Sequence, residues 1–257
     1  MEKFKEMFAA VKKDRCRGYL WSPAFKEIFA VMKKDLKDYF NSPIAYIVIT
    51  IFLVFVGFFF FKDFFLYNQA EMRSFFQLMP LMLSFVIPAV TMKLFSEERL
   101  SGSFEILMTL PVSSKDIVIG KFLAGTIFAV VMIAPTFLYV ITVIFLGSPD
   151  FGPIIGGYIG VILLSAAYTS IGLLASSFTR NQIVAFISAW AVCFFLWLID
   201  KILFFIPAKL GFLTYMGSDY HFQNIAKGVI DSRDLIYFIS VCVLALMFTV
   251  KAVEDRR

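Results

Sequence analysis

The chain has 257 residues, of which 60% are hydrophobic and only 17% charged, and its formal net charge is +5. Its mean hydropathy is +0.83, whereas soluble globular domains contain only about 45–50% apolar residues. The composition therefore excludes an ordinary soluble domain and predicts an all-helical integral membrane protein.

The first predicted element is an amphipathic helix over residues 23–43. Residues 1–22 form an N-terminal extension without an assigned role, and they lack the apolar core of a secretory signal, so they should remain on the mature protein. Ser22 and Pro23 suit a helix start, and apolar residues then recur at helical spacing from Phe25 to Phe40 among charged ones. This pattern predicts a helix in the cytoplasmic headgroup region. A soluble helix packed on a partner is the alternative.

Six hydrophobic segments follow, each close to the length that crosses a bilayer. A span needs about 20 mostly apolar residues to cross a hydrocarbon core of about 30 Å. The segments are Ile44 to Phe61, Phe75 to Met92, Phe122 to Leu146, Pro153 to Ser176, Ile183 to Ile199 and Leu235 to Val250. We therefore predict one six-span domain over residues 44–251 and a cytoplasmic tail over residues 252–257.

Lysine and arginine set the expected orientation, because they accumulate on the cytoplasmic side of a membrane. They are frequent in residues 1–43 and rarer in the loops that would lie outside. Both termini, the loop over residues 96–116 and the turn over residues 177–182 are therefore expected in the cytoplasm of a prokaryotic cell, below its plasma membrane. A basic cytoplasmic face beside anionic headgroups explains the net charge without a nucleic-acid partner.

The loop between the second and third spans is charged and amphipathic. One helical face would carry Leu100, Phe104, Leu107, Met108 and Leu110, and the other Glu98, Ser101 and Glu105. Gly102 would weaken an isolated helix, which indicates a close neighbour, and Pro111 should end the helix. Ser113 and Asp116 resemble a capping box for the next helix. The residues alone fit either an interfacial connector or a helix that inserts into a groove on a cytoplasmic partner.

Known catalytic motifs are not matched. Gly120 and Lys121 are not followed by Ser or Thr and lack the upstream glycine of a nucleotide-binding P-loop, so we expect no ATP hydrolysis by this chain. A zinc protease is disfavoured because His221 is the only histidine, and it is predicted on the opposite side of the membrane from Glu97 and Glu98. We expect no metal site and no catalytic residue.

The outer part of the chain offers two further patterns. Residues 201–234 exceed the length of a simple turn, and helical spacing there joins Phe222, Ile225, Ala226, Val229 and Ile230. Asp231, Ser232 and Asp234 would cap the last helix. Gly156 and Gly160 stand at GxxxG spacing, which fits either close packing within the chain or a dimer seam.

The segment EERLSGSFEILMTLPVSSKDIVIGKF resembles the coupling-helix signature of ABC-2 type transporter permeases. KKDLKDYFNSPIAYIV and HFQNIAKGVIDSRDLIYFIS are similar to the gliding-motility and copper-maturation branch, so the resemblance runs from about Phe25 to Ala252. It implies a permease subunit that pairs with a second permease copy, or a homologous one, in the bilayer. Two cytoplasmic ABC ATPase subunits would hold ATP and Mg, and this chain would bind no cofactor.

The resemblance also implies functional residues. A cytoplasmic coupling helix over residues 98–111 would contact the ATPase, through Glu97, Glu98, Arg99, Gly102, Ser103, Glu105, Leu107 and Pro111. Short re-entrant helices between spans five and six would form an external gate with Asp200, His221 and Phe222. The implied function is ATP-driven movement of an unidentified substrate, as export. The alternative is a membrane scaffold or mechanotransmission subunit that moves no solute.

Overall fold

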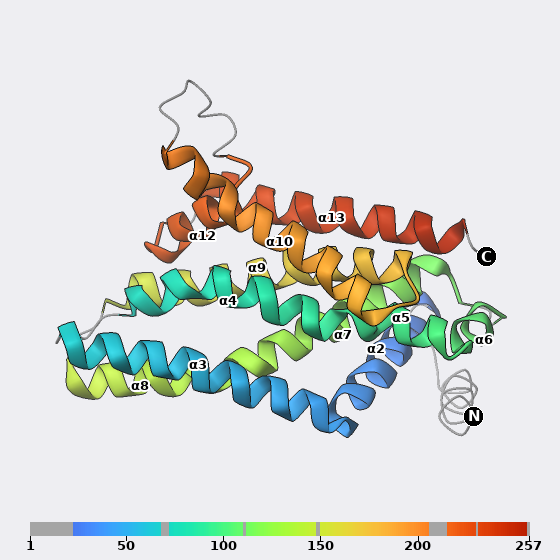
Figure 1. Ribbon diagram of the computed structural model, residues 1–257, viewed down its shortest axis with the longest axis horizontal. Helices are drawn as coiled ribbons and strands as arrows, with labels where there is room; N and C mark the ends of the chain where they lie inside the picture. Colours follow the sequence, from blue (N-terminus) through green and yellow to red (C-terminus); the bar gives the residue numbers. More distant parts are fainter. Residues whose placement is uncertain are drawn as a thin grey trace.

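The computed structural model describes residues 23–67, 72–109, 112–147, 150–205, 215–229 and 231–255. In these residues the chain is helical and contains no strand, as predicted. Figure 1 shows long helices running side by side in one elongated bundle, with α12 near one end and α5 and α6 near the other. The N-terminal extension over residues 1–22 and Pro111 lie outside the described residues.

The helices follow the expected order along the chain. They are α2 (Pro23–Asn41), α3 (Pro43–Tyr67), α4 (Arg73–Thr91), α5 (Lys93–Leu100), α6 (Ser103–Thr109), α7 (Ser114–Ile133), the short 3-10 helix η1 (Ala134–Thr136), α8 (Phe137–Leu146), α9 (Phe151–Phe178), α10 (Gln182–Phe205), α12 (Ser218–Ala226) and α13 (Ser232–Glu254).

Six stretches are long and apolar enough to cross a membrane, and each contains one predicted span. They are Pro43–Lys62, Arg73–Leu100, Ser114–Leu146, Phe151–Phe178, Gln182–Ile202 and Ser232–Glu254. The six-span prediction is therefore confirmed by helix length and composition. The second and third stretches extend beyond the predicted spans into charged sequence. The predicted spans stop where hydropathy falls, whereas the helical structure continues. Similarly, α13 continues to Glu254, inside the segment predicted as a tail.

α9 lies in the middle of the bundle, and small residues bring its neighbours close. A Cβ at Gly156 would collide with the backbone oxygen of Ile225 in α12, and one at Gly160 would lie 3.2 Å from the Phe222 ring. Further along α9, a Cβ at Gly172 would collide with the Thr91 side chain at the end of α4. The GxxxG pair thus serves packing within the chain, which was one of its two predicted interpretations.

α2 begins at Pro23 and ends at Asn41, as the sequence predicted, and a face other than the apolar one predicted for the headgroup region packs on the bundle. Val31, Asp35 and Tyr39, spaced four residues apart, are buried, whereas Phe25 and Phe29 are exposed. A Cβ at Gly120 would lie 2.8 Å from Val31 Cβ, so α2 packs closely on α7. An aspartate on the buried face requires a partner charge, which the site below supplies.

The amphipathic helix predicted in the outer segment is confirmed for its first part. α12 buries Phe222 and Ile225, but it ends at Ala226. Gly228 follows with a φ of +85°, so the chain leaves the helical direction, and Val229 is 67% exposed. The inclusion of Val229 in the helix face was therefore wrong, and Ile230 lies outside the described residues. Asp231 caps α13 by accepting a hydrogen bond from the Arg233 backbone N–H, as predicted.

Candidate functional site

The loop between spans two and three is two helices, not one. α5 continues the direction of α4 through the helical residue Met92 and ends at Leu100, and α6 begins at Ser103. Gly102 between them has a φ of +70°, a conformation that glycine adopts without steric cost. Among the described residues, an added Cβ there would meet nothing within 4 Å. The glycine thus permits a turn, and the predicted close neighbour is not one of the described residues of this chain.

The turn also changes which apolar residues share a face. Phe104 and Leu107 are buried, and the Phe104 ring packs edge-on against Phe95 with centroids 6.1 Å apart. Leu100, predicted on the same face, is 71% exposed, because the turn breaks the helical register between α5 and α6. The side chains of Met108 and Leu110 lie outside the described set. Ser113 caps α7 by accepting a hydrogen bond from the Lys115 backbone N–H at 3.3 Å.

The polar residues of the turn divide into exposed and inward-facing groups. Glu97, Gly102 and Glu105 are exposed, and Ser103 is half-buried. The hydroxyls of Ser101 and Ser103 lie 2.8 Å apart, and both donate to the Glu98 carbonyl, at 3.2 and 3.3 Å. These bonds satisfy a helix-end carbonyl and fix the turn. The exposed side chains therefore stand on a backbone held in one shape.

Arg99 and Glu98 face inward in this chain. Arg99 is buried, and its guanidinium carbon lies 4.9 Å from the centre of the Phe104 ring, a cation–π contact between α5 and α6. Glu98, predicted on the outer face with Glu105, instead points toward α2 and α7. It belongs to a buried group of charges that the sequence pattern did not predict.

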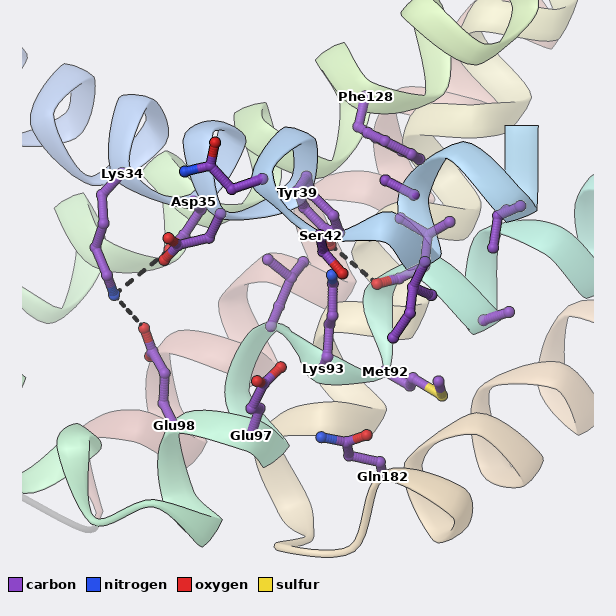
Figure 2. A pocket seen from close by; sticks show the side chains of 18 of the residues that line it. Lys34, Asp35, Tyr39, Ser42, Met92, Lys93, Glu97, Glu98, Phe128 and Gln182 are labelled. Carbon is purple, nitrogen blue, oxygen red and sulfur yellow. Dashed lines mark hydrogen bonds and ion pairs between the residues drawn. The ribbon is translucent and has the colours of Figure 1, made fainter. Parts of the chain in front are cut away.

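Four charged side chains from three helices meet beneath the turn, and we call them the charge cluster: Lys34 and Asp35 of α2, Glu98 of α5 and Lys121 of α7. Lys121 Nζ lies 3.1 Å from Asp35 Oδ2 and 2.8 Å from Glu98 Oε2, and it donates to the Leu94 carbonyl at 2.8 Å. Lys34 Nζ lies 2.5 Å from Glu98 Oε1 and 3.6 Å from Asp35 Oδ1. Figure 2 shows Lys34 between the two carboxylates.

The charge cluster is electrically balanced, which allows it to be buried. Lys121 is only 1% exposed and Asp35 only 6%, so an unpaired charge at either position would be costly. Burial raises the pKa of the Asp35 carboxyl, and the ammonium of Lys121 opposes that rise. Burial lowers the pKa of Lys34, but the charges of Glu98 and Asp35 outweigh this effect, so its pKa is raised. The cluster thus joins α2, α5 and α7 as ion pairs.

A pocket of about 760 Å³ opens beside the charge cluster. It is lined by α2, the first turns of α3, the end of α4, α5, Phe128 of α7 and Gln182 at the start of α10. In Figure 2, Lys93 extends across this space toward Tyr39 and Ser42. Lys93 Nζ lies 4.4 Å from the centre of the Tyr39 ring, and the Tyr39 hydroxyl donates to the Val90 carbonyl at 2.9 Å. Polar and apolar walls therefore meet in one pocket.

The residues predicted at an external gate lie near the opposite end of the bundle. His221 Nδ1 is 2.6 Å from Asp234 Oδ1, its Nε2 is 2.9 Å from the Tyr215 carbonyl oxygen, and its ring stacks on Tyr237. Phe222 is buried against α9. The structure therefore places His221 and Phe222 in packing contacts that hold α12 in the bundle.

Asp200, the third predicted gate residue, is connected to α12 through its neighbour. Lys201 Nζ lies 3.6 Å from Asp200 Oδ2 and 2.6 Å from Asp219 Oδ2, and Asp219 is a buried residue of α12. The end of α10 is thus tied to α12 by charge. Within the described ranges, no group of three or more His, Cys, Asp or Glu side chains could hold a metal ion.

Comparison with known proteins agrees with this architecture at the level of the family. A search of curated proteins found no match. The family model described as ABC-2 family transporter protein matches residues 29–212, which is most of the chain. The matched region begins within α2 and includes the charge cluster, the α5–α6 turn and the first five candidate spans. The chain therefore belongs to the ABC-2 family of transporter proteins and is a multi-pass membrane subunit of the permease type.

Proposed function

We propose that this chain converts movements of separate ABC ATPase subunits into rearrangement of its own helix bundle, and that the contact is the α5–α6 turn. ABC-2 permeases associate with ABC ATPase subunits in general. The supporting observation is that an exposed turn is fixed by its own hydrogen bonds and connected to the bundle by the buried charge cluster. A turn fixed in this way transmits displacement instead of absorbing it.

The residues that the resemblance assigned to the ATPase contact fall into a surface group and an inward-facing group. We assign direct contact to Glu97, Gly102, Ser103 and Glu105, which lie at or near the surface. Three others are inward-facing or buried, and we assign them the role of holding the turn: Glu98, Arg99 and Leu107. Pro111 lies outside the described residues, and its place in the contact rests on the resemblance alone.

The proposed mechanism is a shift between two conformations of the bundle. ATP and Mg are held by the partner subunits, and nucleotide binding there would bring the ATPases together and displace α5. Because Glu98 pairs with Lys34 and Lys121, this displacement passes to α2 and α7 as one unit. A contact stronger in one conformation than in the other shifts the population toward that conformation.

The remaining parts of the proposal follow from charge distribution and resemblance. We place both termini and the α5–α6 turn in the cytoplasm and the spans in the plasma membrane of a prokaryote, with two permease copies or homologues in the complex. We place the chain in the gliding-motility and copper-maturation branch, and we propose that α12 covers the external end of an export route. The alternative is a scaffold or mechanotransmission subunit that moves no solute.

The test is charge reversal at the exposed turn. In membranes that contain the chain and its co-purifying ATPase, Glu105→Arg should reduce permease-stimulated ATP hydrolysis about tenfold, because a reversed charge opposes the partner surface. The matched control is Glu254→Arg, an exposed glutamate at the end of α13. Unchanged stimulation by Glu105→Arg, with normal membrane insertion, would contradict the contact. Intact stimulation without nucleotide-dependent transport into vesicles would favour the scaffold alternative.

A further inference from the structure

The pocket beside the charge cluster lies at a membrane boundary. Its lining includes Ser42 and Ile44, where the first candidate span begins, and Gln182, where the fifth begins. Met92 and Lys93, where α4 passes into α5 and where the span predicted from the sequence ends, form another part of the wall. Residues at the ends of membrane-spanning helices lie beside lipid headgroups, whereas the next helical turns into the membrane lie beside acyl chains.

The pocket lining changes from apolar to polar between the span interiors and the span ends. Toward the span interiors the lining is apolar and consists of Ile44, Ala45, Val48, Ala89 and Val90. Beside the pocket, α3 exposes Ile44, Tyr46 and Ile47, so the surface continues as an apolar one. Toward the span ends the lining carries Lys93 and Glu97 with the polar side chains of Asn41, Ser42 and Gln182. Such a gradient matches a molecule with a polar head and an apolar body.

Two opposite charges on one face of α5 define the polar end. Lys93 and Glu97 are four residues apart, so their side chains project on the same side of the helix. In the described part of the chain, no carboxylate lies within ion-pair distance of the Lys93 ammonium, which instead lies over the Tyr39 ring. The neighbouring Lys34, Asp35 and Glu98 already pair with one another and with Lys121.

We propose that this pocket binds an aminophospholipid from the adjacent leaflet, with phosphatidylethanolamine as the matching chemistry. The Lys93 ammonium pairs with the lipid phosphate, and the Glu97 carboxylate accepts hydrogen bonds from the lipid ammonium. The acyl chains follow the apolar wall formed by Ile44, Ala45 and Val48. The pocket adjoins the proposed ATPase contact, because Glu97 and Ser103 also line it. Lipid binding by the chain alone does not depend on that contact, so the two proposals can fail independently.

Charge explains the choice of an aminophospholipid over an anionic lipid. Outside the balanced charge cluster, the face of α5 in the described part of the pocket presents one cation, Lys93, and one carboxylate, Glu97. A lipid with a phosphate and no amine, such as phosphatidylglycerol, would bring a further negative charge to this surface. A headgroup with both charges supplies an ammonium to Glu97 and a phosphate to Lys93, so its charges match those of the wall.

The test is lipid binding by the full-length chain in detergent, measured by native mass spectrometry with phosphatidylethanolamine and phosphatidylglycerol. We expect about tenfold tighter binding of phosphatidylethanolamine. Lys93→Gln should weaken binding of both lipids, because both carry a phosphate. Glu97→Gln should mainly reduce the preference between them. The matched controls are Lys251→Gln and Glu254→Gln, which change exposed residues of α13 and should bind as wild type does.

Three results would overturn the proposal. The first is equal affinity of the wild-type chain for the two lipids, and the second is unchanged binding by both pocket variants. The third is displacement of the lipid by an equal concentration of soluble glycerophosphoethanolamine, which would assign the pocket to a free phosphate ester. Glu97 is exposed and outside the charge cluster, so its variant tests the site even if Lys93→Gln fails to fold.

Discussion

At the scale of single residues, the charge cluster is the feature that most determines how the turn is held. Lys121 stands in an otherwise apolar stretch of α7 and reaches Asp35, Glu98 and the Leu94 carbonyl. Taking a charge out of water is costly, so each member of the cluster depends on the others. Removing one member therefore costs more than removing an oppositely charged pair.

We therefore predict that Lys121→Met lowers the free energy of unfolding by about 3–5 kcal/mol, because Asp35 loses its closest cation inside the protein. The double variant Lys121→Met with Asp35→Asn should recover part of this loss, since Glu98 keeps its contact with Lys34. Thermal unfolding in detergent measures both. Lys115→Met, an exposed lysine of the same helix, is the control and should change little. Equal losses for Lys115→Met and Lys121→Met would contradict the role of the cluster.

The sequence contained part of the signal for this cluster. A lysine inside an apolar helix needs a counter-charge, and Lys121 could have been flagged for that reason. Its partners could not be chosen, because Asp35 and Glu98 lie 86 and 23 positions away and each stands among other charged residues. Helical periodicity placed Asp35 with the polar residues of α2, whereas packing on α7 buries it.

At the scale of elements, the turn between α5 and α6 shows where local patterns succeed and fail. Phe104 and Leu107 were correctly placed on a buried face, because they are three positions apart in α6 and therefore share one side of the helix. Leu100 was misplaced, because the pattern was continued through Gly102 as one helix. A single glycine is compatible with both a helix and a turn, and only tertiary packing of the two helices decides between them.

The positive φ of Gly102 leads to a prediction about this turn. Gly102→Ala should destabilise the turn by about 1 kcal/mol, because an alanine side chain is strained in that conformation. The expected result is faster amide hydrogen exchange in α6, measured by mass spectrometry. Gly152→Ala is the matched control, since a Cβ there also meets nothing within 4 Å but the backbone conformation is ordinary. Wild-type exchange in Gly102→Ala would show that the turn tolerates a side chain.

At the scale of the whole molecule, the six spans were predictable and their arrangement was not. Hydropathy is a local property, and each predicted segment lies inside one of the six long apolar stretches, the third of which consists of α7, η1 and α8. The central position of α9 depends instead on contacts between distant residues, such as Gly172 with Thr91 and Gly156 with the Ile225 backbone. These contacts make α9 an element that touches both α12 and the end of α4. A displacement of α5 can therefore reach α12 through one helix.

Such transmission across the bilayer requires that the α5–α6 turn and α12 lie on opposite sides of it. In a variant without native cysteines, Ser101→Cys should react with a membrane-impermeant maleimide only after the cells are permeabilised, because we place the turn in the cytoplasm. Val229→Cys, beyond α12, should react in intact cells, and both side chains are exposed. Labelling of Ser101→Cys from outside would reverse the orientation and remove the ATPase from reach of the turn. Labelling of both sites in intact cells would instead contradict the separation of the two ends by the membrane.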